Sequence, residues 1–380
     1  MKQIGLCIER QTLFVAAFFS FFLFSPNWSA AQKSKPSPPK NWEETVRMAE
    51  EEGKVSIYMS RGGEFHKVVA AFHKAYPKIR VTQVLGGFHY ASRILSERRA
   101  NKFLADMVVT GPGTPYYVLY KGRFTDPIKP KLMLAEVTDT SKWWAGKHHY
   151  IDPEESHVFV FMGPVSAAYV AYNTKAIDGR DFKSYYDLLN PKWRGKILME
   201  DPRAPGAARL GLRILFNLPE LGPKYIRRLF GEMNLTLTRD RRQSVDWLAV
   251  GKYPLCMFCS DARYAEAQGL PVAEFRTVDW LKRPAVAPGG TSTLTLLNRA
   301  PHPNASTVFI NWMLSRIGQT ALQDALNVTS RVYESMREDI PKDRIPAEFR
   351  RKKGVDYVMM ATPTRSDNGP PAKLLRQILK

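Results

Sequence analysis

The sequence contains little cysteine, and it has no long apolar run beyond its first 24 residues. Only 3 of the 380 residues are cysteine, which excludes a disulfide-rich scaffold. Without a further run of about 20 apolar residues, a protein with several membrane-spanning helices is also excluded. The G-x-S-x-G elbow, the H-E-x-x-H helix and the Walker loop are absent as well. We therefore expect no catalytic residues and no enzymatic activity.

Acidic residues are too few to balance the basic ones. The chain has 56 Lys and Arg against 36 Asp and Glu, a formal net charge of +20. The positive residues are scattered along the chain, and no zinc-finger spacing or aromatic-basic RNA motif accompanies them. We therefore predict no nucleic-acid partner. The charge indicates mostly a solvated surface and, more weakly, an anionic small ligand.

The N-terminus has the pattern of an export signal. Lys2 and Arg10 precede an apolar run over residues 13–24, which Ser25 and Pro26 end. That run is shorter than the ~20 residues needed to span a bilayer. Small residues then offer a cleavage site after Ala31. We expect a signal peptide over residues 1–31 and a polar, proline-rich linker over residues 32–40; an uncleaved membrane anchor is the alternative.

Two cysteines lie in the C-x-x-C of "PLCMFCSD". Cys256 and Cys259 have no second Cys or His pair at zinc-binding spacing, so we predict no metal. A thioredoxin-like pair would begin just before a helix, whereas Cys256 falls within the expected strand "YPLCMF". Two buried cysteines are the main interpretation, and a local disulfide formed in an oxidising compartment is the second.

The first part of the chain alternates expected strands and helices. "KVSIYM", "IRVTQVL" and "ADMVVTG" have the pattern of strands, and helical patterns precede and separate them. This order predicts an open parallel sheet with helices on both faces, which binds ligands beyond the carboxyl ends of its strands. The residues at those ends are small, polar or glycine-rich. The candidate ligand contacts are Ser60, Arg61, Gly87, Thr110 and Thr114.

The second part of the chain repeats this alternation. "SAAYVAYNT" reads as a strand, "SYYDLLNPKWRGKILMEDP" as a helix, a turn and a strand, and "YPLCMFCSDARYAEAQG" as a strand and a helix. "GGTSTLTLLNRAPHPNA" then predicts a strand that feeds a helix. The ~340 residues after the linker exceed what one core usually supports, so we expect two domains.

This order resembles the extracellular solute-binding proteins of bacterial ABC importers, in the branch that includes the ferric-ion-binding proteins. Seven segments between residues 42 and 331 carry the resemblance. They are "EEGKVSIYMS", "FHKAYPKIRV", "SERRANKFLADMVV", "AAYVAYNT", "YYDLLNPKWRGKILMEDPRAPG", "VDWLAVGKYPLCMFCSD" and "APHPNASTVFINWMLSRIGQ".

The resemblance implies an α/β protein with a two-lobed, type II-like periplasmic-binding-protein fold. Two open sheets would be joined by two crossing strands, with the ligand between the lobes. Residues 41–164 would form the first part of lobe 1, residues 165–288 lobe 2, and residues 289–380 the second part of lobe 1 with a C-terminal extension. Closure is expected by hinge motion near residues 168–173 and 289–295.

The resemblance also implies a function. The protein would be a monomer in the periplasm, would bind a small-molecule solute without a cofactor, and would deliver it to an ABC permease in the inner membrane. A sensor that presents its ligand to a membrane receptor is an alternative, because the binding chemistry would be the same.

Ferric members of the family bind iron with two adjacent tyrosines that follow the strand matching "KYPLCMF". Here Ser260, Asp261, Ala262 and Arg263 follow it, with a single tyrosine at Tyr264. Of the tandem tyrosines elsewhere, "YYDLL" indicates packing in a helix, and Tyr116-Tyr117 stays a minor possibility. We expect a small organic anion as the ligand, with ferric ion as the alternative.

Further candidate contacts lie in and around the second lobe. Ser260 and Asp261 begin the helix after "KYPLCMF", where free amides hold an anion or a carboxylate holds an amine. Asp261 capping that helix is the alternative interpretation. Arginines in loops offer paired donors for carboxylate or phosphate. The remaining candidates are Asn173, Arg203, Arg263 and Thr291.

His302 lies between two prolines just before a helical pattern. Pro303 forces His302 into an extended conformation, and Asn304 is placed to cap the first free amides of the helix. We interpret His302 as a boundary residue of the first lobe and not as a ligand or a catalyst.

The export signal gives the first testable prediction. The mature protein should begin near Gln32, because the apolar run ends before a small-residue cleavage site. N-terminal sequencing of periplasmic material measures this directly. Intact Met1 in a membrane fraction would contradict the prediction.

Overall fold

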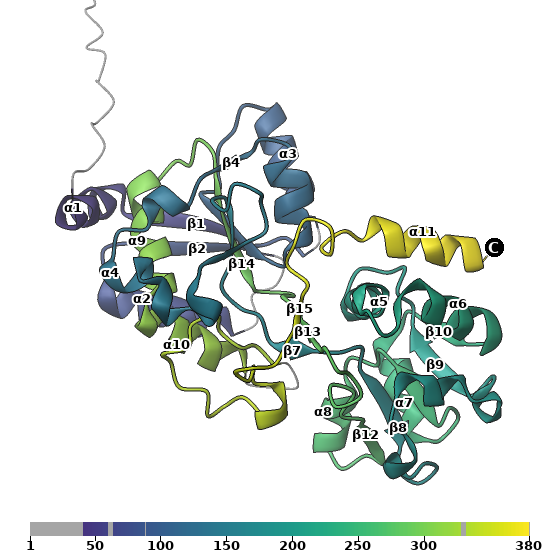
Figure 1. Ribbon diagram of the computed structural model, residues 1–380. Helices are drawn as coiled ribbons and strands as arrows, with labels where there is room; N and C mark the ends of the chain where they lie inside the picture. The colour runs from purple at the N-terminus through teal and green to yellow at the C-terminus, as the bar shows by residue number, and fades with distance from the viewer. Residues whose placement is uncertain (1–40, 60–63, 88, 328–331, 380) are drawn as a thin grey trace, which may run out of the picture. The chain divides into compact units, whose positions relative to one another are not determined.

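Figure 1 shows two separate β-sheets with their helices, and the two largest hydrophobic cores pack against them. The computed structural model describes residues 41–59, 64–87, 89–327 and 332–379. The first core draws on residues 49–162 and 294–361, and the second on residues 167–287 and 358–375. The chain is therefore an α/β protein of two lobes, as the sequence predicted. No described helix is long and apolar enough to cross a bilayer.

The first lobe contains a seven-stranded mixed sheet. Its order is β2-β1-β3-β14-β6-β5, and β4 pairs with β14. Strands β1, β2 and β3 are parallel, whereas β14 runs antiparallel to β3 and β6. The strands are β1 (Lys54–Met59), β2 (Arg80–Leu85), β3 (Met107–Thr110), β4 (Thr125–Asp126), β5 (His149–Tyr150), β6 (Val158–Val160) and β14 (Thr293–Leu297).

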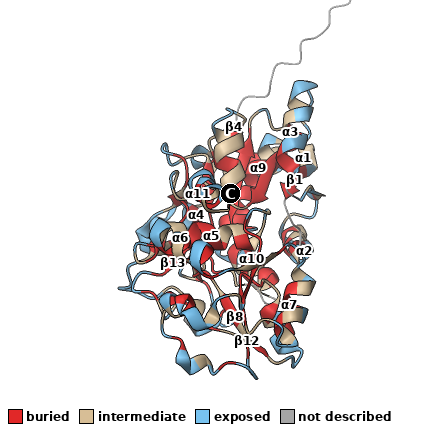
Figure 2. Ribbon diagram, turned by 90° about the vertical axis from the view of Figure 1, so that its right-hand side faces the viewer, coloured by how far each residue is buried: buried red, intermediate tan, exposed pale blue. Residues whose placement is uncertain are grey.

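Helices cover this sheet, and four of its strands, β1, β3, β6 and β14, bury nearly every residue. Figure 2 shows the buried residues concentrated in the strands and along α9. Such continuous apolar runs are typical of strands covered on both faces. The helices of the first lobe are α1 (Trp42–Glu52), α2 (Phe65–Ala75), α3 (Tyr90–Arg99), α4 (Ala135–Thr138), α9 (Pro303–Leu314) and α10 (Arg316–Leu326). Its short helical turns are η1 (Pro115–Tyr120), η2 (Lys129–Lys131), η3 (Thr140–Lys142) and η4 (Trp144–Gly146).

The start of α9 shows why His302 is a boundary residue. His302 occupies the N-cap position, and its imidazole Nδ1 lies 2.9 Å from the buried carboxylate of Asp106. The predicted cap by Asn304 is wrong. The carboxylate of Glu52, from α1, instead accepts hydrogen bonds from the amides of Asn304 and Ala305. A side chain distant in sequence thus satisfies the free amides of this helix.

The helical pattern that begins after Pro303 covers two helices, α9 and α10. Ser315 has an extended conformation, ends α9 and caps α10, because its hydroxyl accepts the amide hydrogen of Gly318. Hydrophobic periodicity continues across this break, so the sequence pattern does not reveal it.

The second lobe contains a five-stranded sheet in the order β10-β9-β11-β8-β12. Strands β9, β10 and β11 are parallel, and β8 is antiparallel to β11 and β12. The strands are β8 (Val170–Asn173), β9 (Ile197–Glu200), β10 (Thr236–Thr238), β11 (Leu255–Met257) and β12 (Val272–Glu274). The helices are α5 (Ala207–Asn217), α6 (Gly222–Glu232), α7 (Arg241–Ala249) and α8 (Ala262–Ala267), with shorter turns η5 (Gly179–Asp181), η6 (Tyr185–Leu189) and η7 (Pro191–Trp193).

A small third sheet lies where the chain passes between the two cores. It contains β7 (Val165–Ser166), β13 (Ala285–Val286) and β15 (Val358–Met359). Strands β7 and β13 are the antiparallel crossing strands, and β15 pairs with β13 in parallel. The predicted hinge segments lie elsewhere: residues 170–173 form β8 inside the second sheet, and residues 293–295 belong to β14 inside the first. The crossing strands β7 and β13 have only two residues each, so the sequence pattern did not distinguish them from the longer buried strands nearby.

The C-terminal segment connects both lobes. It includes η8 (Ala347–Phe349), continues through β15 and ends in α11 (Gly369–Ile378), where Leu374 and Leu375 are part of the second core. Between them, the carbonyl of Pro363 accepts a hydrogen bond from Tyr117 of η1, and the carbonyl of Ser366 accepts one from Arg213 of α5. The sequence-based division had assigned residues 289–380 to the first lobe and an extension.

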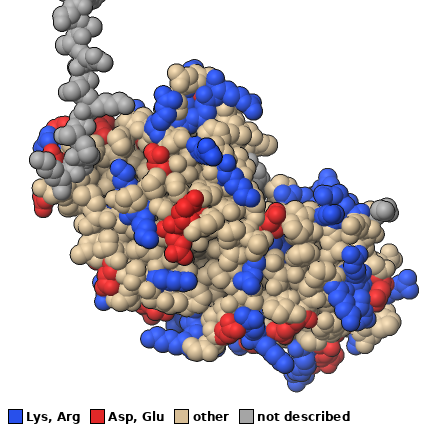
Figure 3. Space-filling view, turned by 45° about the horizontal axis from the view of Figure 1, so that its top comes forward, with Lys and Arg blue, Asp and Glu red and all other residues tan. Residues whose placement is uncertain are grey.

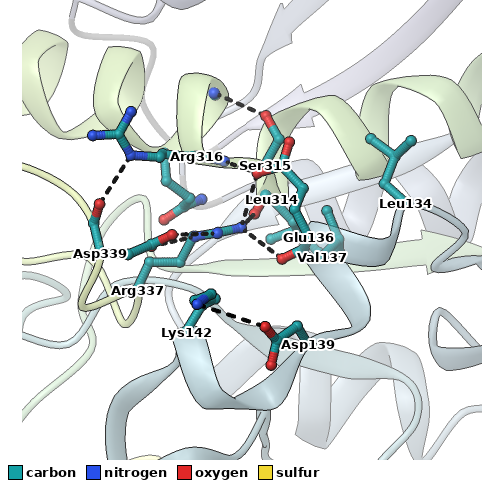
Figure 4. A network of polar contacts seen from close by, with 12 residues as sticks. Leu134, Glu136, Val137, Asp139, Lys142, Leu314, Ser315, Arg316, Arg337 and Asp339 are labelled. Atoms are coloured by element: carbon teal, nitrogen blue, oxygen red, sulfur yellow. Dashed lines mark hydrogen bonds and ion pairs between the residues drawn. The ribbon is translucent and has the colours of Figure 1, made fainter.

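A buried arginine anchors the beginning of this segment (Figure 4). The side chain of Arg337 is 1% exposed and donates to the carbonyls of Leu314 and Glu136, at 3.0 and 3.1 Å. Its Nε and Nη2 also donate to the carboxylate of Asp339, at 2.9 and 2.8 Å. These bonds satisfy a guanidinium that would otherwise be costly to bury.

Replacing Arg337 tests this anchor. Arg337→Met should lower the free energy of unfolding by about 3 kcal/mol, because two carbonyls and one carboxylate lose their donor. Urea denaturation measures the change. The control is Arg344→Met, whose guanidinium is 60% exposed and 3.6 Å from Asp324; it should cost under ~0.5 kcal/mol. Equal losses in both variants would show that Arg337 is no anchor.

Candidate functional site

The first-lobe candidates gather at the carboxyl edge of β3. Thr110 ends this strand, and its carbonyl accepts hydrogen bonds from the amide of Ser292 and the hydroxyl of Thr293. Thr291 and Thr110 are both buried. Burial raises the pKa of Tyr90 to about 12, and the hydroxyls of Thr114 and Thr110 oppose this shift. Thr110 and Thr114 therefore both lie near the hydroxyl of Tyr90, which begins α3, and Gly87 lies in the loop between β2 and α3 with φ of 54°.

The positions of two first-lobe candidates are not tested by the structure. Ser60 and Arg61 lie outside the described residues. Both follow β1, whose carboxyl end lies between those of β2 and β3. They stay predictions.

In the second lobe, three parallel strands end side by side and bring charged residues together. Glu200 ends β9, and its carboxylate accepts hydrogen bonds from the amide and the hydroxyl of Ser260, at 2.8 and 3.0 Å. Asp201 follows and accepts hydrogen bonds from Arg203 and Arg239, at 2.8 and 3.1 Å from Nε. Both carboxylates are buried, so these bonds replace lost water.

The N-terminus of α5 adds two more arginines to this edge. Gly206 precedes the helix with φ of 142°, a conformation that favours glycine. A Cβ at Gly206 would lie 3.4 Å from Nη2 of Arg241, which places that guanidinium against the start of the helix. Arg209, in the first turn, donates to the carbonyl of Arg203. We call Arg203, Arg209, Arg239 and Arg241 the arginine cluster.

The pKa values of the two buried carboxyl groups, Glu200 and Asp201, are shifted in opposite directions. Burial raises the pKa of Glu200 above its ordinary value, and the hydrogen bonds from Ser260 oppose the shift. Burial also acts to raise the pKa of Asp201, but the hydrogen bonds from Arg203 and Arg239 outweigh it and lower the pKa. The arginine cluster therefore surrounds Asp201, which ionises more readily than an ordinary carboxyl group, and Glu200, which ionises less readily. The paired donors of the four guanidinium groups at this edge suit an anion.

The two buried cysteines are joined in a disulfide next to this site. Cys256 and Cys259 enclose Met257 and Phe258; both are buried, as the main interpretation predicted, and they form the local disulfide of the second interpretation. Phe258 has φ of 63°, which is rare for a bulky residue. Its ring lies where a side chain at Gly211 of α5 would be, since a Cβ there would be 2.4 Å away. The disulfide thus closes the turn that leads directly to Ser260.

Of the remaining second-lobe candidates, Asn173 and Arg263 are bonded to other protein groups, whereas Asp261 is not paired with a described residue. Asn173 is buried, and its amide nitrogen donates to the carbonyls of Leu248 and Ala249. Arg263 pairs with Glu274 at 2.6 Å and lies over the ring of Phe349. Asp261 occupies the N-cap position of α8 without a side-chain cap bond, and its carboxylate has no ion pair with the described residues. Asp261 is therefore the more available group.

Three of the four hydroxyls in the two tyrosine pairs are bonded within the protein. Tyr185 donates to the carbonyl of Ala168, and Tyr186 donates to the carbonyl of Glu220. Tyr117 donates to the carbonyl of Pro363, while Tyr116 is buried in the first core. Among the described residues, no group of three or more His, Cys, Asp and Glu side chains is arranged to hold a metal ion.

Sequence reasoning missed Glu200, Arg209, Arg239 and Arg241. Glu200 and Arg209 flank the segment "DPRAPGA", which was already a candidate because of Arg203. The other two follow β10, a three-residue strand in "NLTLTRDRR" that was not predicted. Recognising its alternating pattern would have placed "RDRR" at the same edge as Arg203.

The raised pKa of Glu200 gives a pH-dependent prediction. A carboxyl group with a higher pKa in the folded state binds its proton more tightly when folded. Its contribution to stability is therefore present below the ordinary value of 4.5 and is lost as pH rises through the folded pKa. Glu200→Gln keeps an acceptor for Ser260, so it should match the parent at pH 4 and equal or exceed it at pH 8.

Chemical denaturation of the parent and Glu200→Gln between pH 4 and 8 measures this difference. Glu200→Ala serves as the contrast and should lose about 1–3 kcal/mol at every pH, because the Ser260 amide loses its acceptor. A Glu200→Gln protein that is less stable than the parent at pH 8 would contradict the assignment.

Solved structures with a similar fold include periplasmic binding proteins. Iron-bound HitA from Pseudomonas aeruginosa is 20% identical over 86% of this chain and 99% of that chain, with a TM-score of 0.60. FutA (IdiA) from Trichodesmium, in complex with iron and citrate, is 16% identical over 86% and 99%, with a TM-score of 0.63. AfuA from Actinobacillus pleuropneumoniae, with fructose-6-phosphate bound, is 15% identical over 86% and 97%, with a TM-score of 0.57.

No family model matches the chain, and no curated protein matches its sequence. Identities of 15–20% show a shared fold and leave the ligand undetermined. The fold that the sequence resemblance implied is confirmed: this chain has the two-lobed α/β fold of the periplasmic iron- and solute-binding proteins.

Proposed function

We propose that the protein is the periplasmic substrate-binding component of an ABC importer and that its solute is a small organic anion. The observation that carries this proposal is the arginine cluster. Its four guanidinium groups lie where the parallel strands β9 and β10 end and α5 begins. Sheets of this kind bind ligands at the carboxyl ends of their strands.

The chemistry of the cluster selects carboxylate or phosphate. Guanidinium groups present paired donors, and the start of α5 adds backbone amides that favour negative charge. Asp201 holds Arg203 and Arg239 in place before a ligand arrives, which reduces the entropy lost on binding. The chain would act as a monomer, without a cofactor and without catalysis, and would deliver the solute to an inner-membrane permease.

Closure of the lobes on the ligand forms part of this proposal. The short strands β7, β13 and β15 are the segments between the two cores, so we place the hinge there. The signal peptide and the periplasmic location rest on the N-terminal sequence pattern.

A second candidate is iron, carried as an anionic ferric carboxylate chelate. The observation that favours it is the presence of iron in HitA and of iron with citrate in FutA, both of which share the fold. A chelate would use the arginine cluster as an organic anion does, and it would need no tyrosine pair.

A thermal-shift screen tests the proposal. At 100 times its dissociation constant, the true ligand should stabilise the protein by about 2.7 kcal/mol. That stability raises the melting temperature by at least several degrees, since ~1 kcal/mol moves a domain of 150–250 residues by roughly 2–4 °C. The compounds are carboxylates, phosphate esters, phosphonates, sulfonates, sugars and polyamines, with citrate, ferric ion and ferric citrate as separate samples.

Matched variants test whether the best ligand of the screen binds at the arginine cluster. Arg203→Gln and Arg239→Gln should each weaken the best anion at least tenfold, because each removes charged hydrogen-bond donors. Arg276→Gln, in an exposed pair with Asp279 of the same lobe, should leave it unchanged. Stabilisation by ferric citrate alone would select the second candidate, and stabilisation by free ferric ion with a tyrosinate colour would contradict both.

A further inference from the structure

A second group of cations lies on the first lobe, at the edge away from the candidate site. It comes from three segments: the end of α3, the turn before β4 and the residue pair after β14. Figure 3 shows Lys and Arg side chains gathered on the upper part of the molecule. We call the group the basic edge, and its members are Arg98, Arg99, Lys102, Arg123 and Arg299.

Hydrogen bonds fix these three segments against one another. Arg98 donates from Nη2 to the carbonyl of Asn298 at 2.6 Å, and the amide nitrogen of Asn298 donates to the carbonyl of Arg123 at 2.8 Å. Asn101, Arg123 and Arg299 have φ values of 53°, 61° and 55°. Residues other than glycine rarely adopt this left-handed conformation, and such positions concentrate at functional sites. The basic edge is therefore a built surface and not a random scatter of charge.

The cations of the basic edge are held together without carboxylate partners. The guanidinium groups of Arg98 and Arg299 both lie over the ring of Phe103, at 4.2 and 3.7 Å from its centroid. Burial lowers the pKa of Arg98, the neighbouring charge of Arg299 lowers it further, and the charges of Glu97 and Asp126 oppose the shift. Within the described parts of the chain, none of the five cations forms a salt bridge. The five cations outnumber the two nearby carboxylates, Glu97 and Asp126, so this surface attracts an external anion.

An exposed apolar residue lies within this surface. Leu104 is 48% exposed and directly follows Phe103 in the sequence. Cations beside an exposed apolar side chain suit the boundary between lipid headgroups and acyl chains, where each type of group meets its own environment. A purely acidic protein surface would match the charges but not Leu104.

We propose that the basic edge docks on the surface of an anionic phospholipid bilayer, with its cations on headgroup phosphates and Leu104 at the boundary of the acyl chains. The topology leaves the candidate site free in this orientation. Strand β14 is antiparallel to β3, so its end at Leu297 lies beside the start of β3, whereas Thr110 lies at the opposite end. Docking would retain the protein near the membrane without occupying its solute site.

Vesicle sedimentation tests the proposal with the protein purified from the periplasm. One set of vesicles contains phosphatidylcholine alone, and the other contains phosphatidylcholine with about 30% phosphatidylglycerol. Both are tested at low and at high salt. Binding should require the anionic lipid and should be lost near 0.5 M salt, where screening shortens to a few Å. Arg99→Gln/Lys102→Gln should lower the partition coefficient by about 25-fold, since each cation near an anionic surface contributes about fivefold.

The matched control removes the same charge from the second lobe. Lys224→Gln/Arg227→Gln alters two exposed cations of α6 that also form no salt bridge, and it should change binding less than about twofold. Leu104→Ser keeps every charge and should weaken binding several-fold. Absence of binding to the anionic vesicles, or equal losses in the two double variants, would overturn the proposal. An unchanged affinity in Leu104→Ser would overturn the placement of that residue.

Discussion

The carboxylates of Glu200 and Asp201 organise the second-lobe site, because Ser260, Arg203 and Arg239 are all bonded to one of them. Glu200 accepts the amide and hydroxyl of Ser260, which fixes the turn after β11. Asp201 holds Arg203 and Arg239, which come from the loops after two different strands. A buried carboxylate without these partners would be costly, so strand ends, loops and charges are tied to one arrangement. An anion that enters the site meets donors already in place.

The segments that connect the two lobes limit how the lobes can move relative to each other. Short strands of two residues, β7, β13 and β15, lie between the cores, whereas longer strands build each sheet. The C-terminal segment adds a third passage, anchored by Arg337 in the first lobe and by Leu374 and Leu375 in the second. Motion between the lobes must therefore be accommodated in all three strands and in the segment that bonds to Tyr117 and Arg213.

The sequence predicted the parts of the fold that depend on local pattern. Strands β1 and β3 appeared as apolar runs, and the helical patterns before and between the strands correspond to α1, α2 and α3. The α/β order and the two lobes followed from these elements and from the family resemblance. Contacts between distant residues were not accessible in this way: the cap of α9 by Glu52 spans 252 positions.

The candidate site was predicted only in outline. Ser260 and Arg203 were placed at the correct strand ends, but the residues that hold them, Glu200 and Asp201, were not identified. Asn173 was a candidate because of its position, and its bonds to Leu248 and Ala249 depend on how α7 packs. The disulfide needed the turn at Phe258, whose left-handed conformation no sequence rule predicts for a bulky residue.

The central claim is that the solute is an organic anion held by the arginine cluster. Mass spectrometry of small molecules released from the protein, as purified from the periplasm and then unfolded, tests it most directly. The account predicts one carboxylate or phosphate compound in near-stoichiometric amount, and its loss from the Arg203→Gln/Arg239→Gln protein. Stoichiometric iron without an organic anion, or a neutral or cationic solute retained by that variant, would contradict the account.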